Sequence, residues 1–262
     1  MSTTTPPSAE TPIILMGRGH SGTRVLAYAV RALGVELGFT EAMDKGDPED
    51  DKFRKGMGKL ARNWRKGAAP AKKLRKLTDD WRNRVIKGDH WGWKYPETYL
   101  LIEATHAAYP NAKYIHMVRD GRDLAFKHHR SSDPSTKLGK ALLGTIGAID
   151  DPPHVRAAKS WAYQVDYFRE IADHKLNPAQ IHETTFEDFC TDPVREAERI
   201  AEFLNLSVTE EAREFLRGFI NPKKIAQHRE ADPAKVADVE AAIGPTLRRF
   251  GYMQAEPALA ST

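Results

Sequence analysis

Apolar residues recur along the chain with spacings typical of buried strands and of amphipathic helices. A short apolar run at residues 12–16 and a stretch rich in β-forming residues at 113–118 predict strands, and residues 180–184 are a short strand candidate. Helical spacing predicts helices at 25–33, 98–109, 155–174, 193–204, 208–218 and 233–249. A further helix is expected to follow Asp123 and to end at His129. Residues 131–153 are rich in Gly, Ser, Asp and Pro and predict an irregular, partly mobile connection. The alternation indicates a three-layer α/β fold, a parallel sheet flanked by helices.

Residues 52–87 carry a separate helical pattern. One apolar stripe contains Phe53, Met57, Leu60 and Trp64, and a second, beyond a break at Gly67–Pro70, contains Leu74, Leu77, Trp81 and Val85. The spacings of three and four residues predict two amphipathic helices. Lys and Arg dominate their outer faces, so we interpret 52–87 as a basic helical segment.

Composition limits the class of protein. The 262 residues are 40% hydrophobic and 29% charged, which excludes a disordered or fibrous chain. We predict one domain at 13–252, a disordered lead at 1–12 and a tail at 253–262. A single cysteine, Cys190, excludes an intramolecular disulfide and a cysteine-rich metal site. Without an apolar run long enough for a membrane span, and without a secretory signal, the sequence predicts a cytoplasmic globular protein.

The net charge of +4 hides an uneven distribution. Residues 52–87 hold 14 Lys and Arg against two acids, a balance of +12, so the rest of the chain carries −8. This difference calls for a local explanation.

A glycine-rich turn follows the first predicted strand. Gly17 and Gly22 flank it, and the residues able to bind an oxyanion are Arg18, Gly19, His20, Ser21, Gly22, Thr23 and Arg24. A turn between strand and helix presents backbone N–H groups to an anion. The Lys of nucleotide triphosphatases is missing, and no later strand ends in an Asp that would hold magnesium. An anion site is favoured over a ligand-free tight turn.

The strand at 113–118 leads into Arg119 and Arg122. Ligands of open α/β sheets lie beyond the carboxyl ends of the strands, so these arginines could bind a second anionic group. The alternative is that both pair with Asp120 and Asp123 on the surface.

Together these motifs resemble the sulfotransferase superfamily. His20–Thr23 (HSGT) stands where the family has its 5′-phosphosulfate loop, and Arg119–Asp123 (RDGRD) where it has its 3′-phosphate motif. Three further stretches match in order: Trp93–Pro96, Thr185–Leu206 and Ala241–Tyr252. The basic segment at 52–87 has no counterpart among these motifs, so the resemblance implies an inserted basic helical segment. The resemblance implies a P-loop-like sulfotransferase fold and transfer of a sulfuryl group from 3′-phosphoadenosine 5′-phosphosulfate (PAPS) to a hydroxyl or amine.

The resemblance also implies residue roles. The loop would bind the 5′ group, and Arg119, Lys127 and Arg229 would bind the 3′-phosphate. Lys94 would reach the transferring sulfuryl group, and His20 stands where the family has Lys or Arg, with Arg18 or Arg24 able to supply that charge. Such a transfer depends on positioning and charge stabilisation, so no metal is expected.

The proton acceptor and the acceptor substrate stay open. Glu41, about twenty residues past the loop, is the first candidate for the base, followed by Glu36 and His90. The basic segment is a solvated helical face, a collar for an acidic acceptor such as an anionic glycan or lipid headgroup, or a surface that binds nucleic acid or a membrane. Its aromatic residues lie on the apolar stripe, which argues against nucleic-acid binding.

Three function classes follow. The first is a sulfotransferase acting on a small molecule, glycan or lipid. The second is a P-loop-like nucleotide kinase, and the third is a non-catalytic polyanion-binding protein of the same fold.

Overall fold

The structure is a computed structural model that describes residues 11–38, 51–219 and 224–254. Contacts divide the chain into two compact units. Residues 1–119 and 167–225 form the first, here called the sheet unit, and residues 120–166 and 226–262 form the second, the helical unit. The single domain at 13–252 stays a prediction. Residues 1–10 of the predicted lead and 255–262 of the predicted tail lie outside the described residues.

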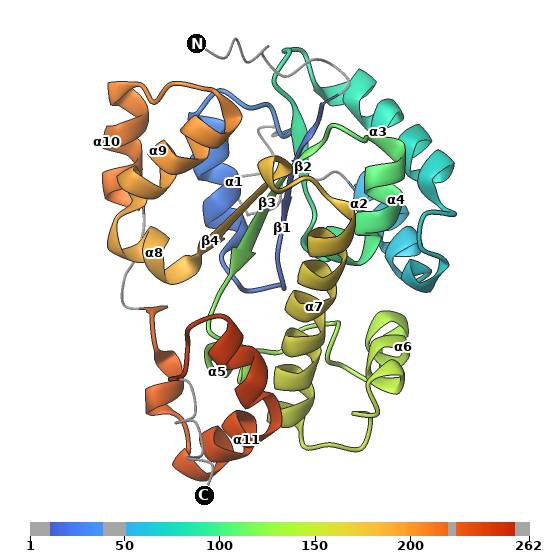
Figure 1. The fold of residues 1–262 in the computed structure, drawn as a ribbon, viewed down its shortest axis with the longest axis vertical. Coiled ribbons are helices and arrows are strands. Elements are labelled where there is room, and N and C mark those ends of the chain that lie inside the picture. The colour runs from blue at the N-terminus through green and yellow to red at the C-terminus, as the bar shows by residue number, and fades with distance from the viewer. Residues whose placement is uncertain (1–10, 39–50, 220–223, 255–262) are drawn as a thin grey trace, which may run out of the picture. The chain divides into compact units, whose positions relative to one another are not determined.

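The sheet unit contains a four-stranded parallel sheet of order β2-β1-β3-β4 (Figure 1). The strands are β1 (Ile13–Met16), β2 (Gly92–Lys94), β3 (Lys113–Val118) and β4 (Ile181–Thr185). The α-helices are α1 (Thr23–Ala32), α2 (Asp51–Ala61), α3 (Ala71–Val85), α4 (Ile102–Ala108), α8 (Phe186–Thr191), α9 (Pro193–Leu204) and α10 (Glu210–Phe219). The 3-10 helices are η2 (Trp64–Lys66), η3 (Pro96–Leu101) and η4 (Pro178–Gln180).

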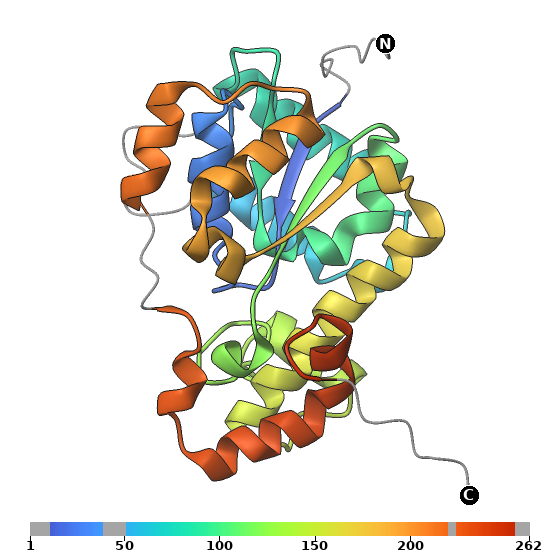
Figure 2. The same ribbon diagram turned by 60° about the vertical axis from the view of Figure 1, so that its left-hand side comes forward.

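Both faces of the sheet are covered. Ile13 and Leu15 of β1 share one apolar core with Ile115 and Met117 of β3 and with α1, α8, α9 and α10. On the other face, the His116 ring lies 4.5 Å from the Phe168 ring of α7 (Pro153–Lys175). Figures 1 and 2 show the helices on either side of the strands. Burial on both faces explains the uninterrupted apolar run of β1 and the largely apolar β3, and it confirms the predicted three-layer fold.

The basic segment packs on the core through aromatic rings. The apolar stripes bury Phe53 of α2 and Trp81 of α3, whose centroids are 4.7 Å apart. Phe53 also lies 6.5 Å from Trp93 of β2, and Trp93 lies 5.9 Å from Tyr109. The two predicted helices are therefore confirmed, with their apolar stripes turned inward. That the segment is an insertion stays a prediction.

A hydrogen-bonded tyrosine fixes α3, and its removal should weaken the fold. The Tyr109 hydroxyl lies 2.6 Å from Thr78 Oγ1 and donates to Asp79 Oδ1 at 3.1 Å. We expect Tyr109→Phe to lower the free energy of unfolding by about 1–2 kcal/mol. Tyr114→Phe is the matched control, because its buried hydroxyl has no partner among the described residues. Urea unfolding should show little change for that variant, and equal losses would contradict the role of Tyr109.

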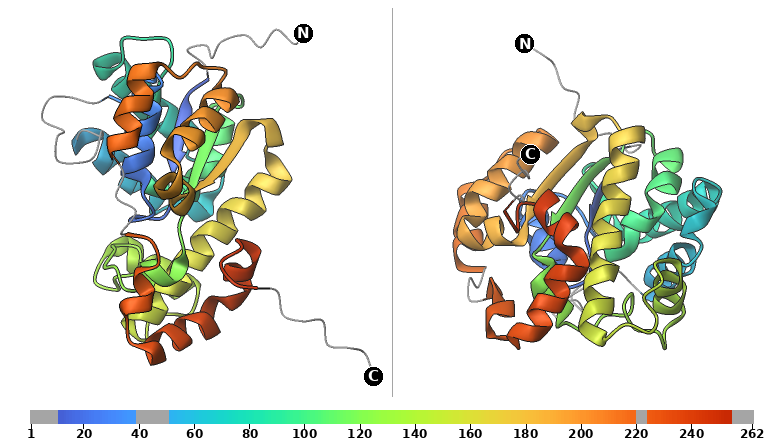
Figure 3. Two further views of the ribbon diagram at one scale, coloured as in Figure 1. Left: turned by 90° about the vertical axis from the view of Figure 1, so that its left-hand side faces the viewer. Right: turned by 60° about the horizontal axis from the view of Figure 1, so that its bottom comes forward.

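The helical unit contains α5 (Gly121–Ala125), α6 (Lys137–Thr145), α7 up to Asp166, η6 (Gln227–Glu230) and α11 (Pro233–Arg249). Helix α11 runs beside α7, as Figure 3 shows. Thr246 of α11 donates to Asp166 Oδ2 of α7 at 2.7 Å, and the Phe250 ring lies 6.3 Å from Trp161. A polar bond and an aromatic contact thus join the two helices.

Three local predictions were wrong. The irregular connection at 131–153 contains α6, which Thr136 caps by accepting from the Gly139 N–H, and which buries Leu138 and Leu142. The helix expected up to 129 ends at Ala125. Residues 98–109 form the end of η3 followed by α4 rather than one helix.

Candidate functional site

The glycine-rich loop joins β1 to α1, and two glycines are required by its close packing. A Cβ on Gly17 would lie 2.4 Å from the carbonyl oxygen of Met117. Gly22 has a φ of 94°, and a Cβ there would lie 2.4 Å from the Phe186 ring. The loop backbone therefore lies directly on β3 and on the start of α8.

The loop has the features of an anion site. Gly22 caps α1, whose first turn holds no acidic residue. The Ser21 side chain is 1% exposed, and its Oγ has no hydrogen-bond partner among the described residues. His20 is exposed and left-handed, with a φ of 73°, and Arg24 is exposed on α1. N–H groups at the helix start and an unused hydroxyl suit a phosphate or sulfate oxygen.

Arg18 supports the loop from inside. Its side chain is 1% exposed, and Nη1 donates to the Gly19 carbonyl at 2.9 Å. Burial lowers the pKa of Arg18 to about 10, an effect opposed by Tyr99 and Glu97. The guanidinium thus stays charged at neutral pH, next to a buried carboxylate, Glu97.

Lys94 lies at the carboxyl end of the parallel strands, the same end at which the loop follows β1. It ends β2 and pairs in register with Leu15 of β1, one residue before the end of that strand. The Gly17 N–H donates to the carbonyl of Pro96, two residues past Lys94, at 3.4 Å. Order β2-β1-β3-β4 puts the reversal of strand order between β1 and β3, where ligands of open α/β sheets bind.

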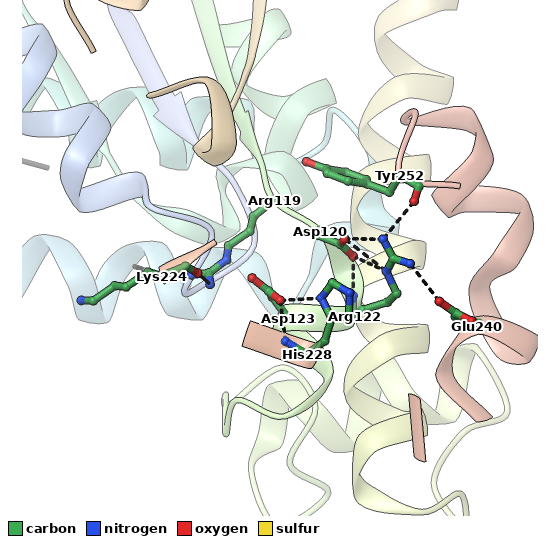
Figure 4. A network of polar contacts seen from close by, with 8 residues as sticks. All are labelled: Arg119, Asp120, Arg122, Asp123, Lys224, His228, Glu240 and Tyr252. Carbon is green, nitrogen blue, oxygen red and sulfur yellow. Dashed lines mark hydrogen bonds and ion pairs between the residues drawn. The ribbon is translucent and has the colours of Figure 1, made fainter. Parts of the chain in front are cut away.

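Arg119 connects the end of β3 to the loop (Figure 4). It donates to the His20 carbonyl at 3.3 Å and to the Lys224 carbonyl at 2.6 Å. Its guanidinium carbon lies 4.4 Å from the centre of the Phe186 ring. The side chain is 5% exposed, so Arg119 brings a buried positive charge to the loop.

The rest of the arginine motif belongs to the helical unit, where its charges are paired (Figure 4). Arg122 donates to Asp120 at 2.7 Å, to Glu240 at 2.8 Å and to the Tyr252 carbonyl at 2.9 Å. Asp123 accepts from the backbone N–H of His228 at 2.9 Å and lies 2.7 Å from its Nδ1. The ion pair with Asp120 considered from sequence is therefore present for Arg122.

The remaining candidates from the sequence are Lys127, Arg229, Glu41, Glu36 and His90. Lys127 is half-buried and Arg229 is exposed, both in the helical unit. Glu41, the first candidate for the base, lies outside the described residues. Glu36 pairs with Trp91 in an isolated bridge before β2, and its N–H donates to the His90 carbonyl. Glu36 and His90 are therefore at the amino end of β2, away from the loop.

Three contributors were missed by the sequence analysis: Phe186, Lys224 and Glu97. Phe186 contacts both Gly22 and Arg119, and it belongs to the matched stretch at 185–206, for which only the likeness was noted. Glu97 directly follows the matched stretch Trp93–Pro96, and this position in the sequence could have indicated that Glu97 lies near the loop. Lys224 contributes a backbone carbonyl, which no side-chain pattern reveals.

Cys190 gives a pH-dependent test of the surroundings of Arg119. Burial raises the pKa of its thiol to about 11, and Glu187 raises it further, while Arg119 and Lys224 oppose both. Only the thiolate reacts with alkylating agents. We expect iodoacetamide to label native Cys190 hundreds of times more slowly than a free thiol at pH 7.5, and about tenfold faster per pH unit up to pH 11. The rate in urea is the control, and labelling that levels off near pH 8.5 would contradict the raised pKa.

The outer face of the basic segment carries unpaired charge. Six exposed lysines have no ion-pair partner within the described residues: Lys59, Lys66, Lys72, Lys73, Lys76 and Lys87. In the part of the chain that the structure describes, no three His, Cys, Asp or Glu side chains gather to hold a metal ion. None of the helices described there is long and apolar enough to cross a membrane.

The parallel sheet and its loop define a P-loop-like α/β protein, and the sequence gives its family. A sequence model of the Sulfotransferase family matches residues 12–210. The chain therefore belongs to the sulfotransferase family, and the protein is a sulfotransferase. No curated protein matches the sequence.

Solved structures share the fold at low identity. Sulfotransferase STF9 from Mycobacterium avium is 14% identical with a TM-score of 0.60, over 95% of this chain and 78% of its own. The sulfotransferase domain of the Synechococcus PCC 7002 olefin synthase is 14% identical with a TM-score of 0.55, and the match covers 97% of this chain and 98% of that domain. Mouse sulfotransferase SULT7A1 complexed with PAP is 14% identical with a TM-score of 0.55, and the match covers 94% of this chain and 87% of the mouse chain.

Proposed function

We propose that the protein transfers a sulfuryl group from PAPS to a hydroxyl or amine of a small-molecule, glycan or lipid acceptor. The observation that carries the proposal is the Ser21 hydroxyl, 1% exposed and without a partner among the described residues, at the start of α1. Such a group suits an oxyanion. The mouse protein of the same fold is complexed with PAP (adenosine 3′,5′-bisphosphate), the product that PAPS leaves after transfer, and this supports the choice of donor.

The residues present fit a donor with anionic groups. The loop backbone from Gly19 to Thr23 and the Ser21 hydroxyl would hold the 5′ group, and Arg119 would hold the 3′-phosphate. Lys127 and Arg229 are further proposed ligands of that phosphate. PAPS supplies the sulfuryl group and an anionic leaving group.

Within this chain, catalysis would come from fixed charge. Lys94 and the N–H groups at the start of α1 would stabilise charge on the leaving oxygen, with His20 or Arg24 as additional donors. Transfer without a metal stays a prediction, as do the cytoplasmic location and Glu41 as the base. The exposed lysines of the basic segment favour an anionic acceptor.

Two measurements test the function. Calorimetry should show binding of PAP (adenosine 3′,5′-bisphosphate) and much weaker binding of ATP–magnesium; the reverse order would contradict the donor. Incubation with PAPS and an acceptor library should yield a sulfated product by mass spectrometry.

A matched pair of variants tests the loop. Ser21→Ala should weaken PAP about tenfold, since it removes a hydrogen bond to a charged group. Ser207→Ala removes an exposed hydroxyl and should change nothing.

A further inference from the structure

The helical unit contains an open pocket of about 630 Å³. Its lining comes from the end of α5, the connection before α6, the start of α7 and the start of α11. The volume is that of a small-molecule site. All of its residues belong to one compact unit.

Part of the pocket lining is aromatic. The rings of Phe126 and His154 lie 6.3 Å apart and are nearly parallel, at 8°. His154 is held in place by Asp238, 3.1 Å from its Nε2. Three prolines add to the apolar lining: Pro134, Pro152 and Pro153. A planar, apolar body would remove this surface from water.

The charged lining is positive. Lys127, Arg156 and Lys235 line the pocket and have no ion-pair partner among the described residues. Arg156 Nη1 donates to the Ile149 carbonyl at 3.3 Å, but its buried Nε has no hydrogen-bond partner there. A buried N–H of this kind favours an acceptor atom from a ligand.

The carboxylate in the lining is already engaged. Asp133 accepts from the hydroxyl of Ser135 at 2.7 Å and from its N–H at 2.8 Å, and it lies 3.1 Å from His128 Nε2. These hydrogen bonds, from Ser135 first, hold the pKa of Asp133 below its ordinary value. Asp133 therefore stays ionised, and against the three cations it leaves the lining with a net positive charge.

We propose that this pocket is a binding site for a planar, apolar organic anion, with its body against Phe126 and His154 and its acidic group held by Arg156 and Lys235. This site is additional to the donor site and does not depend on sulfuryl transfer.

Calorimetry with 2-naphthoate tests the proposal, because the neutral 2-naphthamide has the same body. We expect one equivalent of 2-naphthoate to bind at least about tenfold more tightly than the amide. Equal affinities would overturn the proposal, since the charge would then play no part.

Variants locate the binding. Lys235→Gln and Arg156→Gln should each weaken 2-naphthoate about five- to tenfold, and Lys140→Gln, which removes an exposed charge of α6 outside the pocket, should not. Lys235 is exposed, so its variant keeps the test valid even where Arg156→Gln fails to fold. Wild-type affinity in Lys235→Gln would overturn the proposal.

Saturating PAP separates the pocket from the donor site. Lys127 is also a proposed ligand of the 3′-phosphate, so 2-naphthoate binding is measured again with the donor site filled by PAP. Unchanged 2-naphthoate binding supports a separate site, and competitive displacement would assign the pocket to the donor and overturn the proposal.

Discussion

Lys94→Met is expected to lower kcat for sulfuryl transfer by about 100- to 1000-fold. Lys94 is 1% exposed at the carboxyl end of β2, where its strand meets the loop that follows β1. A buried cation in that position would stabilise charge that develops only as the bond to the leaving oxygen breaks. Methionine has a similar length and is apolar, so the fold should be retained while that charge is lost.

The steady-state constants reveal which state Lys94 stabilises. A loss confined to kcat, with PAP affinity within a few-fold of wild type, is the expected result. A parallel loss of PAP affinity would instead make Lys94 a ground-state ligand, and an unchanged kcat would remove it from the mechanism.

Lys113→Met is the matched control for Lys94. Lys113 begins β3 at the opposite end of the sheet, where it donates to the Ala179 carbonyl at 2.8 Å and lies over the Phe203 ring. Its replacement should affect stability more than turnover. Similar kcat losses in both variants would indicate a general effect of removing a lysine from the sheet.

The sequence predicted those parts of the fold in which local pattern and burial agree. β1 and β3 are buried on both faces, and their apolar runs were recognisable. α6 was missed because Gly139 and Gly144 lower its helix propensity, and Gly139 is needed because a Cβ would lie 2.0 Å from the Asp133 carbonyl oxygen. β2 has three residues, too few for an alternating pattern.

The site was predictable where it consists of consecutive residues. The loop and Arg119 were identified from their places after two strands. The partners of Arg119 and Asp123 were not, because the Lys224 carbonyl and His228 are each 105 residues further along the chain. Local spacing carries no information on contacts that depend on how distant segments fold back.

Arg119→Gln is expected to weaken PAP by about 100-fold. The substitution removes a buried charge together with the hydrogen bonds to the His20 and Lys224 carbonyls and the contact with Phe186. Losing one partner of a buried, hydrogen-bonded charge pair costs about 2–5 kcal/mol. Arg195→Gln, which removes an exposed charge on α9, is the control and should bind PAP normally.

A second ligand separates the two ways in which Arg119 could act. AMP lacks the 3′-phosphate, so a direct contact with that phosphate predicts that Arg119→Gln weakens AMP only a few-fold. If Arg119 served only to hold the loop through the His20 carbonyl, both nucleotides would weaken equally. Arg119→Lys keeps the positive charge but loses the planar guanidinium that can donate two parallel hydrogen bonds. If the phosphate is the partner, Arg119→Lys should therefore bind PAP more tightly than Arg119→Gln and less tightly than wild type. Equal losses for PAP and AMP, with no recovery by lysine, would contradict the 3′-phosphate assignment and leave Arg119 as the residue that positions the loop.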